Sequence, residues 1–135
     1  MASLINISSA VSLALHSMEY LTRNPGRLVS TREIAEGFEM SENHLAKVHQ
    51  RLAKCGLIRA VRGPGGGVEL AKAPEEITLL DIFTAIEGEV ESGYCLLGEP
   101  TCGRRVCMMK DLVRKVHHDI LDYFAKTRLS DVKED

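Results

Sequence analysis

Three cysteines stand close together in the second half of the chain. Cys95, Cys102 and Cys107 lie within thirteen residues, separated by six residues and then by four. An odd group of thiols is not a disulfide framework, and a structural zinc site normally has four ligands, often in Cys-x-x-Cys pairs, which this stretch lacks. Three thiolates can hold a soft metal ion or an iron–sulfur cluster and leave one position for a weaker ligand. The spacing therefore predicts a redox-active metal site that serves as a sensor.

Two other interpretations of the reactive side chains are weaker. A cysteine nucleophile at Cys107 would need a base such as His117 or His118, and nothing in the sequence orients such a pair, so we expect no enzyme. The remaining cysteine, Cys55, stands at a predicted helix end and is more typical of a core residue.

Positive charge is concentrated in the middle of an otherwise acidic chain. The 135 residues carry a formal net charge of −2, yet residues 43–72 hold six basic residues and one acidic residue, a local charge of +5. One basic region on an acidic chain is typical of a nucleic-acid-binding surface. The composition, 44% hydrophobic and 27% charged, is that of a globular protein.

The elements that would position this charge form a helix-turn-helix. Residues 4–23 have apolar side chains at helical spacing and end at Asn24-Pro25-Gly26. Ser30 with Glu33 predicts a capping box for the next helix, and a second short helix spans about Glu42 to Lys54, ended by Gly56. Two short helices joined by a tight turn are a helix-turn-helix.

A β-hairpin follows directly. Ile58–Arg62 and Val68–Ala71 read as strands on either side of a glycine-rich reversal, which makes them a wing. A phosphate-binding loop is the other reading of these glycines, but no helix begins after Gly67.

The C-terminal part reads as a short helix, a loop and a long helix. Thr78 with Asp81 caps the short helix, and residues 89–107 are loop. A long helix follows from about Met108 to Phe124, with an apolar stripe from Met109 to Phe124. One small domain cannot cover so long a helix, which predicts a homodimer. The expected fold is mainly α with a β-hairpin wing, as a DNA-binding winged helix-turn-helix (1–74) and a sensor loop with dimerisation helix (75–135), in one integrated domain.

The same placement predicts the contacts with double-stranded DNA. The first residues of a recognition helix reach base edges in the major groove, while arginines on the helix and the wing contact phosphates or the minor groove. The predicted DNA-binding residues are Ser41, Asn43, Lys47, Arg51, Arg59 and Arg62.

Several motifs together resemble one family of regulators. The stretches Ser41-Glu-Asn-His-Leu-Ala-Lys-Val, Gly56-Leu-Ile, Val61-Arg-Gly-Pro-Gly-Gly-Gly-Val and Pro74-Glu-Glu-Ile-Thr-Leu resemble the Rrf2 family of winged-helix transcription regulators, over about residues 4–132. The three cysteines place the resemblance in the branch that binds iron–sulfur clusters. It implies a homodimer on a pseudo-palindromic operator, with Cys95, Cys102 and Cys107 as ligands of a [2Fe–2S] or [4Fe–4S] cluster that senses redox state, nitric oxide or iron–sulfur status.

The resemblance leaves the fourth ligand open. Relatives place an aspartate or a histidine where this chain has Ser12 and Lys110, and neither of these residues is a good iron ligand. His16 lies one helical turn beyond Ser12 on the same polar face, and a neutral imidazole is a good ligand, so we predict His16 as the fourth ligand. The resemblance implies that it would reach across the dimer interface. The other interpretations of His16 are a solvated histidine and a contact with a DNA phosphate. The alternative is a metal-free thiol redox switch on the same fold.

The sequence also carries expectations about location. It has no run of 18 apolar residues and no signal-peptide pattern at its start. We therefore expect a cytoplasmic protein without a membrane partner.

Overall fold

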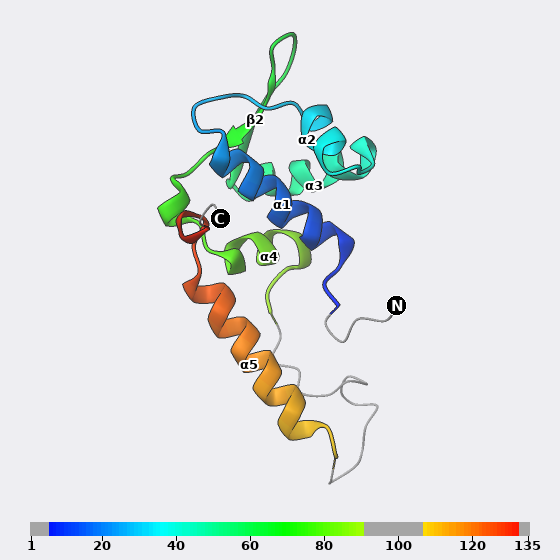
Figure 1. Ribbon diagram of the computed structural model, residues 1–135, viewed down its shortest axis with the longest axis vertical. Coiled ribbons are helices and arrows are strands. Elements are labelled where there is room, and N and C mark those ends of the chain that lie inside the picture. Colours follow the sequence, from blue (N-terminus) through cyan, green and yellow to red (C-terminus); the bar gives the residue numbers. More distant parts are fainter. Residues whose placement is uncertain (1–5, 91–106, 133–135) are drawn as a thin grey trace.

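The computed structural model describes residues 6–90 and 107–132. In chain order these residues form helices α1 (Ser9–Arg23), α2 (Thr31–Gly37) and α3 (Glu42–Lys54), strands β1 (Ile58–Val61) and β2 (Gly67–Leu70), and helices α4 (Leu79–Glu87) and α5 (Lys110–Lys126). Short 3-10 helices, η1 (Pro74–Glu76) and η2 (Leu129–Asp131), precede α4 and follow α5. The fold is mainly α-helical with a small β-hairpin, as the sequence predicts (Figure 1).

Helix α1 begins at Ser9, later than the apolar pattern from residue 4 predicts. The reason is the side chain of Ser8, whose Oγ accepts a hydrogen bond from the backbone N–H of Val11 at 3.2 Å. A serine in this position satisfies one of the N–H groups that the first turn leaves without a partner, and so fixes the helix start. The same hydroxyl donates to Oε1 of Glu87 at 2.5 Å, which joins the start of α1 to the end of α4.

The predicted capping box of α2 is only half formed. Ser30 Oγ accepts from the backbone N–H of Glu33 at 3.0 Å, but the Glu33 carboxylate accepts instead from Arg27 at 3.0 and 2.9 Å and from the Tyr20 hydroxyl at 2.6 Å. The hydrogen bonds from Arg27 and Tyr20 lower the pKa of Glu33 to about 2. Glu33 therefore holds the turn between α1 and α2 rather than its own cap.

The hairpin is attached to the helices by a backbone bridge. Strands β1 and β2 pair antiparallel from Ile58 opposite Leu70 to Val61 opposite Gly67. Beyond this pair, Val68 exchanges backbone hydrogen bonds with Val29, at 2.9 and 2.7 Å. A Cβ on Gly67 would lie 2.5 Å from the Val29 carbonyl oxygen. Only glycine allows this approach, so the wing is seated firmly on the segment before α2.

One hydrophobic core joins the helix-turn-helix, the hairpin and the C-terminal part. Thr78 and Asp81 form both bonds of their predicted capping box, at 3.1 and 3.0 Å, and start α4. After α5 the chain returns to the core, where the Leu129 N–H donates to the Ile77 carbonyl at 2.9 Å. Both side chains are almost fully buried together with apolar residues of α1, α3 and α4. The core is therefore continuous across residue 74.

Helix α5 projects away from this core (Figure 1). It begins at Lys110, slightly later than the predicted Met108, and none of its residues is buried. Only its C-terminal part packs on α4, where the rings of Phe83 and Phe124 meet edge to face with centroids 6.1 Å apart. Within the described parts of the chain, no helix is both long enough and apolar enough to span a membrane.

A buried histidine lies where α3 meets α1 and α2. His49 of α3 is 4% exposed. Its Nδ1 is 3.0 Å from Oγ1 of Thr31 at the start of α2, and its Nε2 is 3.1 Å from Oγ of Ser17 in α1. Burial lowers the pKa of the imidazole to about 4. His49 is therefore a neutral core residue at physiological pH, and the hydroxyls on either side satisfy both ring nitrogens.

This burial predicts an acid-sensitive contribution to stability. The unfolded chain binds a proton at His49 below a pH of about 6.5, whereas the folded chain resists protonation until about 4. The free energy of unfolding should therefore decrease as the pH is lowered from about 6.5 to about 4, by up to about 1.4 kcal/mol per pH unit for this one proton. We expect chemical denaturation at stepped pH values to give a steeper slope for the wild type than for His49→Gln. Equal slopes for the two proteins would contradict it.

Candidate nucleic-acid interface and sensor segment

Helix α3 is amphipathic and presents its polar face outwards. Leu45, Val48 and Leu52 are buried in the core. At 100° per residue, Asn43 and Lys47 lie on the opposite face, and both are exposed. Ser41 precedes the helix and its Oγ accepts from the His44 N–H at 3.4 Å, so Ser41 is the N-cap. The helix thus has the start, the exposure and the polar face that the sequence predicts for a recognition helix.

Two exposed residues extend this face beyond the predicted contacts. Gln50 and Lys54 follow Asn43 and Lys47 at three- and four-residue spacing and lie on the same side of α3. A count of helical spacing outward from Asn43, rather than inward from the leucines, would have found them. The resulting polar stripe runs along the whole helix.

The wing carries Arg62 at its exposed turn. Gly63 and Gly65 have φ values of 98° and 74°, which side-chain-bearing residues rarely adopt, and this allows the chain to reverse within a few residues. Arg62 stands at the entrance of that turn and is exposed. The structure therefore places an exposed Arg62 where the hairpin turn begins, and the hairpin extends away from the helices (Figure 1).

The other two predicted arginines have partners within the chain. Arg59 of β1 forms an ion pair with Glu69, which lies directly opposite it on β2. Arg51 of α3 donates from Nη1 to the backbone carbonyl of Ile86, 3.1 Å away in the last turn of α4. Sequence reasoning missed both interactions. Nothing local to Arg51 indicates a carbonyl 35 residues away, and the pair of Arg59 and Glu69 depends on the register of the two strands. Contacts of either residue with DNA phosphates stay predictions.

Only part of the predicted metal site falls within the described residues. Cys95 and Cys102 lie outside them. Cys107 is described, is exposed, and directly precedes the first turn of α5. Within residues 6–90 and 107–132, no group of three or more His, Cys, Asp or Glu side chains lies close enough to hold a metal ion.

His16 lies on α1 with its ring against the helix-turn-helix. Its Nδ1 is 2.6 Å from the Ser12 carbonyl oxygen, and its ring meets Phe38 edge to face with centroids 5.2 Å apart. A carbonyl can only accept, so Nδ1 carries the proton and Nε2 of the neutral ring keeps its lone pair. The start of α5, beside Cys107, lies at the far end of the molecule from α2 (Figure 1). Within one protomer the structure does not bring His16 and Cys107 together.

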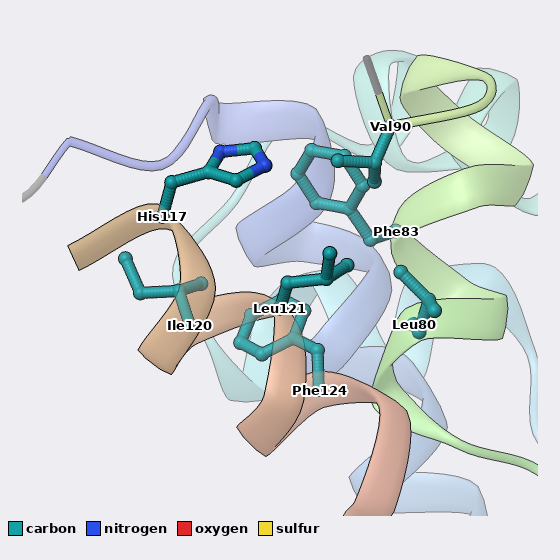
Figure 2. A pocket seen from close by; sticks show the side chains of 7 residues that line it. All are labelled: Leu80, Phe83, Val90, His117, Ile120, Leu121 and Phe124. Atoms are coloured by element: carbon teal, nitrogen blue, oxygen red, sulfur yellow. The ribbon is translucent and has the colours of Figure 1, made fainter. Parts of the chain in front are cut away.

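A small apolar cavity lies between α4 and α5, beside their contact. It has a volume of about 120 Å³. Figure 2 shows Leu80 and Phe83 of α4 pointing towards Leu121 and Phe124 of α5, with His117 at one side. Ile120 also lines the cavity and is 41% exposed, so the cavity adjoins the exposed side of α5.

Comparisons with known proteins agree with this architecture. Residues 7–135 match the Rrf2 family, described as iron-dependent transcriptional regulators. The transcriptional regulator NsrR of Bacillus licheniformis is 34% identical over 111 residues, which are 77% of this chain and 76% of that protein. Two solved structures are also similar. T. potens IscR is 27% identical with a TM-score of 0.74, and the match covers 95% of this chain and 85% of that one. The oxidized form of Staphylococcus aureus CymR is 28% identical with a TM-score of 0.75, and the match covers 97% of this chain and 99% of that one. This chain therefore belongs to the Rrf2 family of transcriptional regulators.

Proposed function

We propose that this chain is a cytoplasmic, homodimeric transcription regulator whose affinity for a double-stranded DNA operator is gated by an iron–sulfur cluster. The cluster would sense redox state, nitric oxide or iron–sulfur supply. The observation that carries the gating is the group of three cysteines within thirteen residues, which ends immediately before α5. The family and its fold support regulation through DNA rather than catalysis.

The exposed stripe of α3 and the wing support a two-part DNA contact. In a helix-turn-helix the first residues of the second helix contact base edges. Asn43 can pair with adenine and Lys47 with guanine. Arg62, on the wing, suits a phosphate or the narrow minor groove and would set affinity and register rather than sequence.

The donor set supports a cluster. Cys95, Cys102 and Cys107 supply three thiolates, the preferred ligands of iron–sulfur clusters. The fourth position would be filled by Nε2 of His16. A ligating histidine usually donates its other N–H to a carbonyl or carboxylate, which fixes the ring and its tautomer. The hydrogen bond from Nδ1 to the Ser12 carbonyl has this arrangement. When bound, the cluster would supply a redox-sensitive and nitric-oxide-sensitive centre, and the chain's residues would orient it.

His16 and Cys107 lie apart within one chain. To bind the same cluster as Cys107, His16 would therefore have to come from the partner subunit. Helix α5 and the turn before it carry an apolar stripe that is exposed among the described residues: Met108, Leu112, Val116, Ile120 and Tyr123. Such a stripe, next to the cavity of Figure 2, is typical of an interface between two copies of a chain. Dimerisation along α5 would bring the partner's first helix towards the cysteine segment.

The end of α4 supplies a physical connection between the cysteine segment and the recognition helix. Its last turn receives the hydrogen bond from Arg51 of α3 and the one from Ser8 of α1. Gly88, with φ at 86°, ends the helix, and the segment that carries the cysteines follows. A conformational change in that segment would therefore move the end of α4, which is hydrogen-bonded directly to α3.

A metal-free thiol switch on the same fold is the second candidate. It is favoured by the similarity to Staphylococcus aureus CymR, whose structure is of an oxidized form. In that case oxidation of the cysteines, rather than cluster loss, would move the end of α4. The two candidates share the DNA contacts and differ in cofactor.

For the DNA contacts, we expect Lys47→Ala to relax base preference, with a loss of about 1–3 kcal/mol at the base it reads. Arg62→Ala should instead weaken binding to all sequences and lower the salt slope by about one unit. Both are measured by titration of duplexes that the wild type selects from a random library. Lys126→Ala, on exposed α5, is the control. An unchanged preferred sequence and affinity for Lys47→Ala would show that α3 is misassigned.

For the dimer, a charge on the exposed stripe should separate the protomers. Val116→Glu would bury a carboxylate in the interface, which costs several kcal/mol without a partner. We expect light scattering to report monomer or insoluble chain. The control His118→Glu places the same charge on the other side of α5 and should stay dimeric. A wild type that is monomeric at micromolar concentration would contradict the assignment.

For the cluster, we expect protein purified without oxygen to absorb in the visible range and to contain iron and acid-labile sulfide. Cys102→Ser should lose the cluster, His16→Ala should shorten its lifetime, and Cys55→Ser should retain it. Cluster loss should change operator affinity about tenfold or more, within the usual range of allosteric coupling. A colourless protein whose DNA affinity follows thiol oxidation would favour the second candidate. A His16→Ala spectrum and lifetime equal to wild type would exclude the histidine ligand.

A further inference from the structure

The buried face of α3 contains a polar contact, between His49 and the hydroxyls of Ser17 and Thr31. Hydrophobic packing of α3 does not require this contact. A buried polar group is stabilising only when its partners are in place. Among the described residues, Ser17 and His49 are the buried polar ones in an otherwise apolar core, and an apolar side chain in place of His49 would need no hydrogen-bond partners. The chain instead places a histidine on α3 and one hydroxyl on each neighbouring helix.

The three groups satisfy one another completely. A neutral imidazole has one donor nitrogen and one acceptor nitrogen, and a hydroxyl can serve either of them. With Ser17 at 3.1 Å and Thr31 at 3.0 Å, either tautomer of His49 makes both bonds. Within the described residues, no buried side-chain nitrogen or oxygen lacks a partner. We call Ser17, Thr31 and His49 the polar pin.

The polar pin restricts the rotation of α3 about its own axis, which apolar contacts restrict less. Leu45, Val48 and Leu52 hold α3 against the core, but apolar contacts have little directional preference. Side chains extend about 5–6 Å from a helix axis, so a 15° rotation moves their ends by about 1.5 Å. A hydrogen bond to a base edge tolerates only a few tenths of an ångström. Two hydrogen bonds from one ring to two different helices resist that rotation.

We propose that the polar pin sets the rotational position of α3 and is therefore a determinant of base discrimination. His49 is a positioning residue: it acts on DNA through Asn43 and Lys47, which lie on the opposite face of its helix. The proposal rests on the proposed role of α3 as the recognition helix. It requires no cluster, so it stands apart from the gating mechanism.

The test replaces the pin by apolar side chains of similar volume. In the triple variant Ser17→Ala, Thr31→Val, His49→Leu no hydroxyl is left without a partner, so the chain should still unfold cooperatively. Full-chain proteins are compared on two duplexes: one that the wild type selects from a random library, and a scrambled duplex of equal length. The measured quantity is the ratio of the two dissociation constants, well below every melting temperature.

We expect the ratio for the triple variant to fall at least tenfold, through weaker binding of the selected duplex, with an unchanged salt slope. The matched control Val48→Ala makes a cavity in the same helix and leaves the pin intact. It should lower the melting temperature and keep the ratio within about twofold. His49→Gln, which can restore both bonds, should recover most of the discrimination.

Other outcomes overturn the proposal. A folded triple variant with wild-type discrimination would show that the pin serves stability only, as would an equal loss in Val48→Ala. If the triple variant does not fold, the single variant Thr31→Val is used instead, because it removes only one of the two hydrogen bonds. An unchanged ratio of dissociation constants in that variant would contradict the proposal. A wild type that selects no sequence would overturn the role of α3 itself, and the pin with it.

Discussion

Helix α3 must satisfy two environments at once. One face is part of the hydrophobic core, and the other is an exposed row of polar and basic side chains. The neighbouring elements hold this helix in place. Helices α1 and α2 cover its inner face, α4 packs across it, and the hairpin begins directly after Gly56 ends it. Because the inner contacts fix the outer face, core packing would also set the geometry of the proposed DNA contacts.

The long helix α5 differs from α3 because none of its residues is buried in the hydrophobic core. Its inner side meets α4 through Phe124 and Leu121, while its outer side exposes apolar residues to solvent. Burial of one such side chain contributes about 1.5–3 kcal/mol, so an uncovered stripe of this length represents a large stabilisation still to be gained. A second copy supplies an identical stripe, which is why two-fold dimers are the commonest solution. The cavity between α4 and α5 lies beside this stripe, since Ile120 belongs to both.

Local patterns predicted the elements well, and long-range contacts escaped them. The bounds of α3, the hairpin and the Thr78–Asp81 capping box follow from residues within a few positions of one another, and the structure confirms them with small shifts. The start of α1 was wrong because the apolar pattern extends past a serine cap. Glu33 was misread because Arg27 and Tyr20 compete for its carboxylate. The partners of Arg51 and His49 lie on other helices, and no spacing rule reaches them. Of the predicted metal ligands, Cys107 and His16 could be placed, and Cys95 and Cys102 lie outside the described residues.

These long-range contacts share a pattern that bears on regulation. Arg51 and His49 are two residues apart on α3, yet they bond to different neighbours: Arg51 to the end of α4, and His49 to α1 and α2. The first contact leads towards the segment with the cysteines, and the second leads into the fixed part of the fold. A helix whose rotation the polar pin resists, and whose other side is bonded to the end of α4, can change its position only together with one of these neighbours. Coupling between two sites requires such an element with two positions. Under the proposed gating, a second position of α3 would change its bond to the end of α4, because the polar pin ties α3 to α1 and α2.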